Sequence, residues 1–187
     1  MLNEKLLVEQ CISNNDGALD ELYKRYSPKL FGICLRYTKN HQEAEDLLHD
    51  GFIRILENLN SFRREGSFEG WLRRIMVTSA INHYRKNKQR STEQELVDYR
   101  LKDGAAEPIL DSLSMNELLG VIRELPDGYQ MVFNLYVMEG YKHREIAEIL
   151  DISENTSKSQ FMKARKALQQ SIALMNREAR EQVEKVR

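Results

Sequence analysis

HREIAEILDISENTSKSQFMKARKAL, residues 143–168, holds two runs of apolar residues at helical spacing, separated by a very short break. The first run is Ile146, Ala147 and Leu150, and the second is Phe161, Ala164 and Leu168. Ser153 is a favourable N-cap residue, and Glu154 places negative charge at the positive end of the following helix dipole. The pattern predicts a helix over 143–150, a tight turn, and a second helix from about residue 154, which is the layout of a helix-turn-helix.

The second of these helices is basic. No acid occurs from Asn155 to Gln170, although the whole chain has a net charge of −1. The residues expected to face outward are Asn155, Thr156, Lys158, Ser159, Met162, Lys163 and Lys166. Lysines neutralise phosphates, whereas Asn, Ser and Thr can reach base edges in a major groove. An ordinary helical hairpin with a solvated basic face is the alternative, but the acid-free run favours nucleic acid.

Composition narrows the class of protein. The chain has 187 residues, of which 41% are hydrophobic and 30% are charged, and only three are proline. These values are typical of a helix-rich globular protein. No apolar run approaches the roughly 18 residues that span a membrane, and the first residues do not resemble a secretory signal. Cys11 and Cys34 are too few for a disulfide framework, so we expect buried free thiols and a cytoplasmic protein without membrane insertion.

Helical spacing dominates the rest of the chain, and no strand alternation is evident. We predict helices over 16–37, over 44–59 and from an N-cap at Ser67 to about Arg90, with Pro28 either breaking the first helix or starting another. Residues 91–112 are acidic and weakly periodic, which is typical of a linker. This linker could be a solvated spacer, could pass through a basic channel of a partner, or could fold back on the basic faces of the free protein. The predicted fold is therefore all-α: a helical domain over 1–90, a flexible linker over 91–112, and a helix-turn-helix domain over 113–187.

A second basic stretch, residues 61–90, holds eight basic and two acidic residues together with several aromatic ones. Basic and aromatic residues in alternation suit single-stranded or melted DNA, whose bases stack on rings while cations follow the backbone. Phe68 and Trp71 share a face with apolar residues, so we expect them in the core. Phe62 and Tyr84 are the candidates that we expect to be freer.

Three segments in this order resemble a known family: EAEDLLHDGFIRILENLNSF (43–62), SFEGWLRRIMVTSAINHYRK (67–86) and LPDGYQMVFNLYVMEGYKHREIAEILDISENTSKSQFMKARKAL (125–168). Together they are similar to bacterial RNA polymerase sigma factors of the extracytoplasmic-function (ECF) subgroup. The resemblance implies that the chain binds core RNA polymerase, through the largest-subunit clamp helices and the flap region, and directs initiation at specific promoter DNA. An anti-sigma factor is a further partner that the resemblance implies, because many members are held by one.

The resemblance also implies site residues. The polymerase-facing segment would include Asp46, Leu47, His49, Asp50 and Phe52. The −10 element would be recognised and melted by Phe62, Arg63, Arg64, Arg73, Arg74, Asn82, Tyr84 and Arg85. The −35 element would be read by Lys158, Ser159, Met162 and Lys163, with Asn155, Thr156, Gln160 and Lys166 nearby.

This chain departs from the family pattern at three places. Ser157 stands where an apolar core residue is expected, and Gln160 stands where a cation is expected. The sequence Asn82-His83-Tyr84-Arg85 lacks the Asp that often precedes the Arg. No other member's promoter sequence should therefore be carried over.

Three rival functions remain at this point. A helix-turn-helix regulator that acts without being a polymerase subunit would bind duplex DNA tightly by itself. An enzyme would need a site such as His41, Glu45 and His49, which share one helical face and could hold a metal. A purely structural bundle would not need two basic faces. We expect neither catalytic residues nor a metal or cofactor, and we favour the sigma factor.

Overall fold

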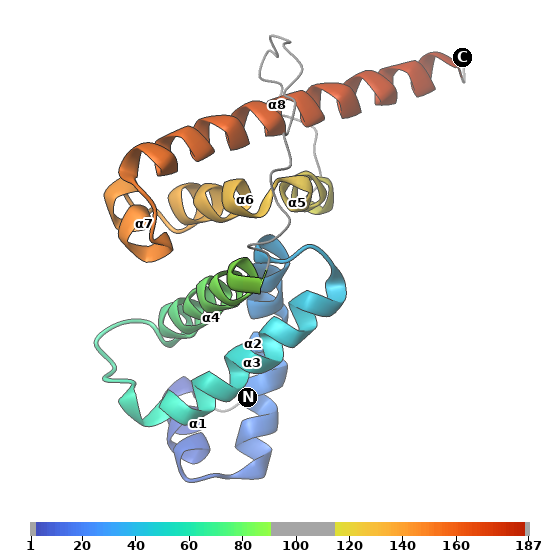
Figure 1. Ribbon diagram of the computed structural model, residues 1–187. Helices are drawn as coiled ribbons and strands as arrows, with labels where there is room; N and C mark the ends of the chain where they lie inside the picture. The colour runs from blue at the N-terminus through green and yellow to red at the C-terminus, as the bar shows by residue number, and fades with distance from the viewer. Residues whose placement is uncertain (1–2, 91–114, 186–187) are drawn as a thin grey trace. The chain divides into compact units, whose positions relative to one another are not determined.

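The computed structural model describes residues 3–90 and 115–185, and in these residues every regular element is helical, as predicted (Figure 1). Contacts divide the chain into two compact units, unit 1 (Met1–Lys86) and unit 2 (Asn87–Arg187). The predicted linker, 91–112, lies outside the described residues, so its two boundaries stay predictions. None of the described helices has the length and apolar character needed to cross a bilayer.

Unit 1 is built from four α-helices and one 3-10 turn. They are α1 (Glu4–Ile12), α2 (Asp16–Tyr37), α3 (His41–Asn58), η1 (Leu59–Ser61) and α4 (Phe68–Arg90). Side-chain caps mark the start of all four α-helices, with Asn3 capping α1. Asn15 accepts a hydrogen bond from the Ala18 amide at 3.0 Å, and Asn40 accepts one from the Glu43 amide at 2.9 Å. Ser67 Oγ accepts one from the Gly70 amide at 3.0 Å, which confirms the predicted N-cap.

The core of unit 1 draws on all four helices. Its largest fully buried side chains are Leu7, Leu22, Leu30, Leu47, Ile55, Phe68, Leu72 and Met76. Helices α3 and α4 approach closely at Gly51, where an added Cβ would lie 2.5 Å from Met76 Sδ. Any larger residue at this position would therefore make the end of the Met76 side chain move.

The structure corrects the expectation at Pro28. Helix α2 runs through this residue without a break. An interior proline forfeits one backbone hydrogen bond, but Pro28 is exposed while Tyr26 and Leu30 on either side of it are buried. Packing on both sides of the proline therefore holds the helix together.

Unit 2 contains α5 (Met115–Glu124), α6 (Asp127–Phe133), the π-helical segment η2 (Asn134–Met138), α7 (His143–Leu150) and α8 (Glu154–Lys185). Leu125 and Pro126 separate α5 from α6, and Gly140, with a φ of +77°, follows the end of η2. The hydrophobic cluster of this unit includes Val121, Ile122, Leu125, Ala164, Ala167 and Leu168. Helix α8 thus packs its apolar face on α5 and α6.

The turn between α7 and α8 has the geometry expected of a helix-turn-helix. Asp151 is left-handed, with a φ of +52°, and the Ile152 amide donates to the Ala147 carbonyl at 3.1 Å. Ser153 Oγ then accepts from the Thr156 amide at 3.0 Å, so the predicted N-cap of α8 is confirmed. One left-handed residue and one serine cap redirect the chain within a few residues.

Candidate nucleic-acid interfaces

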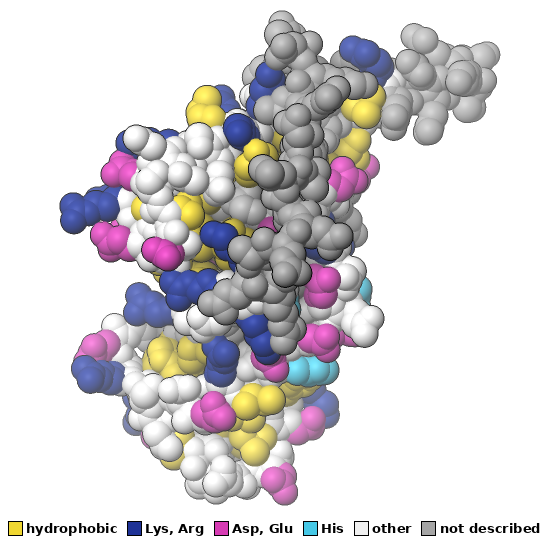
Figure 2. Space-filling model, viewed as in Figure 1, with side chains coloured by type: hydrophobic (Ala, Val, Ile, Leu, Met, Phe, Trp, Pro, Cys, Tyr) yellow, Lys and Arg dark blue, Asp and Glu magenta, His cyan; other side chains and the backbone are white. Residues whose placement is uncertain are grey.

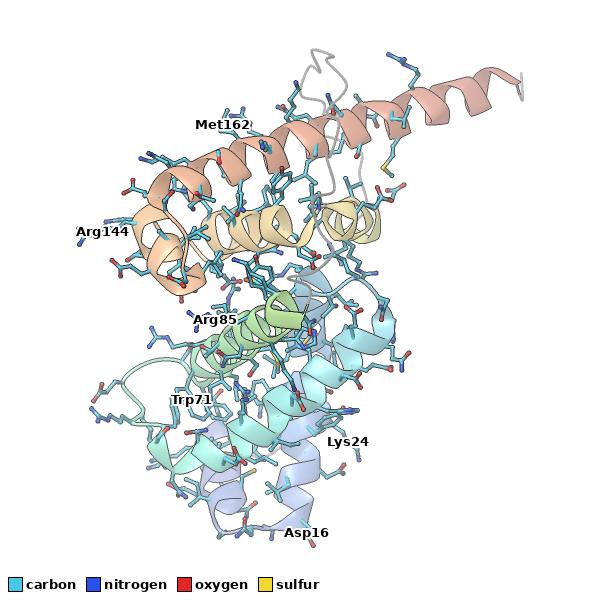
Figure 3. The ribbon with its side chains drawn as sticks, in the orientation of Figure 1. Asp16, Lys24, Trp71, Arg85, Arg144 and Met162 are labelled. Carbon is cyan, nitrogen blue, oxygen red and sulfur yellow. The ribbon has the colours of Figure 1, made fainter. Side chains whose placement is uncertain are left out.

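The outer face of α8 presents side chains suited to a DNA groove. Asn155, Lys158, Ser159, Met162 and Lys163 are exposed, as predicted, and Thr156, Gln160 and Lys166 are half-buried. Met162 is 59% exposed and lies on the side of α8 away from α6 (Figure 3). An exposed apolar side chain at this position suits contact with a thymine methyl group.

Two of the lysines on this face have partners within unit 2. Lys158 Nζ lies 2.6 Å from Glu154 Oε1, and this hydrogen bond and charge lower the pKa of the Glu154 carboxyl. Lys163 Nζ lies 5.9 Å from the centre of the Tyr129 ring, which is within cation–π range. Neighbouring side chains therefore position both ammonium groups in the absence of DNA.

Gln160 occupies the flank of α8 rather than its outer face. Its amide atoms lie 3.1 Å or more from where a Cβ at Gly128 would be, so the side chain rests on α6. The residue that replaces the family's cation is thus engaged in packing. Its assignment to DNA stays a prediction.

The structure accounts for the unexpected Ser157. This residue is fully buried, and its Oγ lies 3.0 Å from His143 Nδ1 at the start of α7. The His143 ring stacks on Tyr136 with centroids 4.4 Å apart, and Phe161 lies 4.6 Å from the same tyrosine. A hydrogen bond between the two helices therefore replaces the apolar contact that we expected at residue 157.

Arg144 is a candidate contact that the sequence analysis missed. It follows His143 in the first turn of α7, and its Nε lies 3.5 Å from Glu148 Oε1 with most of the side chain exposed (Figure 3). In a helix-turn-helix, the first helix crosses the DNA backbone. The sequence signal for this contact was a basic residue in the first turn of the predicted helix over 143–150.

A pocket of about 520 Å³ opens between the η1–α4 loop and the first turns of α4. It is lined by Ser61, Phe62, Arg63, Glu65, Gly66, Ser67, Gly70, Trp71 and Arg74. The labelled Trp71 lies beside the loop (Figure 3). The volume lies within the range of small-ligand pockets, and the lining joins two aromatic rings to two cations.

The aromatic residues of this pocket differ from expectation. Phe62 is half-buried, and so freer than the fully buried Phe68, but its ring lies 5.0 Å from Phe68 and 5.4 Å from Trp71 and packs against both. Phe68 is buried, as predicted, whereas Trp71 is only half-buried and lines the pocket. The loop folds back onto α4 and makes Phe62 part of an aromatic floor.

The predicted −10 cations do not share one environment. Arg63 and Arg74 are exposed at the pocket, whereas Arg73 is half-buried. Arg64 donates from Nη2 to Glu9 Oε1 of α1 at 2.9 Å. The structure thus brings two of the five predicted arginines, Arg63 and Arg74, to the pocket.

Farther along α4, Asn82 and Tyr84 are half-buried and Arg85 is exposed (Figure 3). Tyr84 is thus more exposed than the buried Phe68, and its role in the −10 contact stays a prediction. On the face in view, Lys and Arg side chains stand among acidic ones on each unit (Figure 2).

The outer face of α3 is the third predicted surface. Asp46, His49 and Asp50 are exposed, but Leu47 is 2% and Phe52 is 6% exposed. Leu47 and Phe52 belong to the unit's own core, so their expected contact with polymerase is corrected. The sequence analysis missed Ile53 and Leu56 on this face, which are 55% and 41% exposed. Exposed aliphatic residues beside charged ones are typical of a protein interface.

The residues of the rival metal site are not assembled. His41 Nδ1 lies 3.2 Å from Glu45 Oε1, and its ring meets Phe31 edge-on at 4.9 Å. Among the described residues, no group of three or more His, Cys, Asp and Glu is placed to hold a metal ion.

Comparisons with known proteins agree with this division into two units. Residues 22–90 match the Sigma-70 region 2 family, and residues 115–168 match the Sigma-70 region 4 family. The ECF RNA polymerase sigma factor SigM of Bacillus subtilis (strain 168) is 30% identical over 160 residues, which cover 85% of this chain and 96% of SigM. The chain belongs to the ECF family of RNA polymerase sigma factors.

Two further comparisons involve this sigma factor. The ECF RNA polymerase sigma factor SigW of the same organism is 30% identical over 179 residues, covering 90% of this chain and 96% of SigW. The sigma factor RpoE, solved in complex with the anti-sigma factor NepR from Bartonella quintana, is 21% identical with a TM-score of 0.48, covering 81% of this chain and 94% of that one.

Family membership decides between two of the functions considered. It supports a polymerase-associated sigma factor with RNA polymerase and promoter DNA as partners. It does not support a regulator that acts without being a polymerase subunit.

Proposed function

We propose that this sigma factor divides promoter recognition between its two units, with α8 reading the −35 duplex and the pocket beside the η1–α4 loop taking a base of the opened −10 element. The pocket carries the proposal. It joins aromatic rings, which stack on any unpaired base, to arginines that follow a single strand.

The proposed duplex contact relies on the outer face of α8. Asn155 and Ser159 lie on the exposed side near its N-terminus, where a recognition helix meets base edges. Lys158 and Lys163 flank them and would meet phosphates. Thr156, Gln160, Met162 and Lys166 complete the proposed set.

The proposed −10 contact relies on the pocket and on α4. Phe62 and Trp71 offer the aromatic surface, and Arg63 and Arg74 lie at the same opening. A base can enter such a pocket only after it has left the duplex, because stacking inside a helix hides its faces. Binding there therefore favours the opened state. Arg73, Asn82, Tyr84 and Arg85 would guide the strand along α4.

The proposed polymerase contact relies on the outer face of α3. Asp46 and Asp50 supply charge, His49 supplies a polar ring, and Ile53 and Leu56 supply exposed apolar area. Apolar residues within a charged rim are typical of a specific interface. We assign this face to the clamp helices of the largest subunit, and unit 2 to the flap region.

The chain has no catalysis of its own in this proposal, because polymerase supplies the chemistry and the sigma factor supplies promoter choice. It acts in the cytoplasm, where its polymerase is, and an anti-sigma factor is its proposed inhibitor. With a net charge of −1, the free chain gains little from counterion release, so its own affinity for duplex DNA is weak. Contacts made together in the holoenzyme reinforce one another through effective concentration.

The test is transcription on fragmented genomic DNA of the source organism, with core polymerase alone and with core plus the chain. The proposal expects a discrete set of start sites that require the chain, and permanganate-reactive thymines near −10 at those sites. Start sites that are identical with and without the chain would contradict it.

A further inference from the structure

Helix α1 lies outside the region that matches the Sigma-70 region 2 family, which begins at residue 22. It nevertheless contacts η1, the turn that leads into the pocket loop, and it contributes Leu7, Val8 and Cys11 to the core of unit 1 (Figure 1). We propose that α1 is a strut for the pocket loop, with Glu9 and Arg64 as the positioning residues. The inference rests on the function proposed above for that loop.

The first contact of the strut is the ion pair between α1 and the loop. Arg64 Nη2 lies 2.9 Å from Glu9 Oε1, across 55 residues of sequence, and each side chain is just under half exposed. Arg64 also has a φ of +60°, in the left-handed region that residues with a Cβ seldom adopt. Such a conformation persists only where its surroundings hold it. The carboxylate of Glu9 is the partner that does so.

The second contact reaches the floor of the pocket. Tyr26 is 4% exposed, its hydroxyl donates to Glu4 Oε2 at 3.0 Å, and its ring meets Phe68 edge-on at 5.5 Å. Phe68 in turn stacks on Trp71 with centroids 5.7 Å apart. One acid near the start of α1 thus supports the aromatic floor, while another acid farther along supports the loop above it.

This arrangement assigns Arg64 a role different from that of Arg63 and Arg74. Those two residues line the pocket, whereas Arg64 is directed to α1. Arg64 therefore sets the shape of the loop that presents Arg63. If Arg64 positions the loop, exchanging the charges of residues 9 and 64 should preserve promoter opening. If Arg64 contacts a phosphate directly, the same exchange should impair opening.

The experiment compares Glu9→Gln, Arg64→Glu and the charge-exchanged double variant Glu9→Arg/Arg64→Glu in the full chain. Asp16→Asn, an exposed acid at the start of α2, is the matched control. Two readouts are taken: hydrogen exchange of amides 62–66 in the free chain, and the rate of open-complex formation by holoenzyme at a promoter found with the wild type.

We expect Glu9→Gln to speed loop exchange and slow opening by roughly two- to fivefold, which is the range that an exposed ion pair supports. Arg64→Glu, which sets two carboxylates against each other, has a larger effect. The double variant returns to within about twofold of the wild type, because the ion pair is rebuilt in reverse. Affinity for a −35 duplex and for core polymerase stays unchanged in all variants.

Two outcomes would contradict the proposal that α1 supports the pocket loop. If the double variant opens DNA as poorly as Arg64→Glu, then Arg64 contacts DNA itself. If Glu9→Gln leaves loop exchange at the wild-type rate, then the ion pair does not hold the loop. The exchange measurement needs no polymerase, so it decides the inference even if the wild-type chain directs no initiation and the proposed function fails.

Discussion

His143 Nδ1 and Ser157 Oγ lie 3.0 Å apart and join the first helix of the helix-turn-helix to the buried face of the second. Residue 157 is a core position, where an apolar side chain was expected. The hydroxyl is acceptable there because the imidazole satisfies it. The angle between α7 and α8 therefore depends on a directional contact, which specifies geometry more strictly than apolar packing does.

Removing this hydrogen bond should loosen unit 2. We expect Ser157→Ala to lower the free energy of opening α7 and α8 by about 1 kcal/mol, the net value of a typical hydrogen bond. Ser157→Val should not restore it, because the added methyl groups meet the packed His143 ring and overpacking costs about 1–3 kcal/mol. Hydrogen exchange of the α7 and α8 amides in the full chain measures both effects.

Ser159→Ala is the control for that pair of variants. Ser159 is exposed on the same helix, and its hydroxyl donates only to the Thr156 carbonyl one turn earlier, so the change should stay within about 0.5 kcal/mol. A Ser157→Val variant more stable than the wild type would show that the histidine contact contributes nothing.

Duplex binding by unit 2 should weaken in a salt-dependent way when its lysines are removed. Lys158→Ala and Lys163→Ala should each lower the slope of log affinity against log salt by about 0.9, the value of one phosphate contact. Binding of the holoenzyme to a −35 duplex at several salt concentrations gives the slopes. Arg177→Ala removes the same charge farther along α8 and should leave the slope unchanged. If the wild type and the three variants have equal slopes, then neither Lys158 nor Lys163 contacts a phosphate of the DNA.

Much of the fold follows from local sequence. Ser67 and Ser153 were predicted as N-caps, and each accepts a hydrogen bond from a backbone amide at the start of α4 and α8. The continuity of the helix at Pro28 could not be predicted from the sequence, because a helix continues through proline only when packing on both sides holds it. That packing is tertiary and leaves no mark in the neighbouring residues.

The candidate site was only partly predictable for the same reason. The outer face of α8 follows from helical periodicity alone. The position of Phe62 depends on how a loop folds back onto α4, and the partner of Arg64 is 55 residues away. The sequence pattern predicts the helix over 44–59, but it did not show that Ile53 and Leu56 stay 55% and 41% exposed in unit 1.

The pocket arginines should be needed for opening but not for duplex binding. We expect Arg63→Ala and Arg74→Ala each to reduce permanganate reactivity of the −10 thymines at a fixed time by roughly threefold or more, because a charge-assisted contact to the strand is lost. Binding to a −35 duplex should be unchanged, since that contact belongs to the other unit. Lys24→Ala, an exposed lysine of α2, is the control for loss of one positive charge from unit 1.

Tyr26 should make the stability of unit 1 depend on alkaline pH. Burial, followed by the hydrogen bond to Glu4, raises the pKa of the Tyr26 hydroxyl to about 12. An unfolded tyrosine titrates near pH 10, so the folded state retains the proton that the unfolded state loses between those values. The contribution of Tyr26 to the free energy of unfolding is therefore fully present below pH 10, and it falls as the pH rises toward about 12.

Urea unfolding followed by Trp71, the chain's single tryptophan, measures this dependence in unit 1. Between pH values of about 9 and about 11, the wild type should lose more stability than Tyr26→Phe, which has no proton to lose. Other groups titrate in both proteins and cancel in the comparison. Equal losses would mean that the folded environment of the hydroxyl does not favour its neutral form.

Core-polymerase binding should depend on the uncovered aliphatic residues of α3. We expect Ile53→Asp to weaken binding by roughly tenfold or more, because a carboxylate would be buried without a partner at the centre of the interface. Ile53 is 55% exposed in the free chain, so the substitution leaves the fold intact. Leu6→Asp is the matched control, since Leu6 is 43% exposed on α1 and lies outside the proposed face. If both variants bind core polymerase equally well, the polymerase docks on a different surface, and Asp46, His49 and Asp50 are solvent-facing charges only.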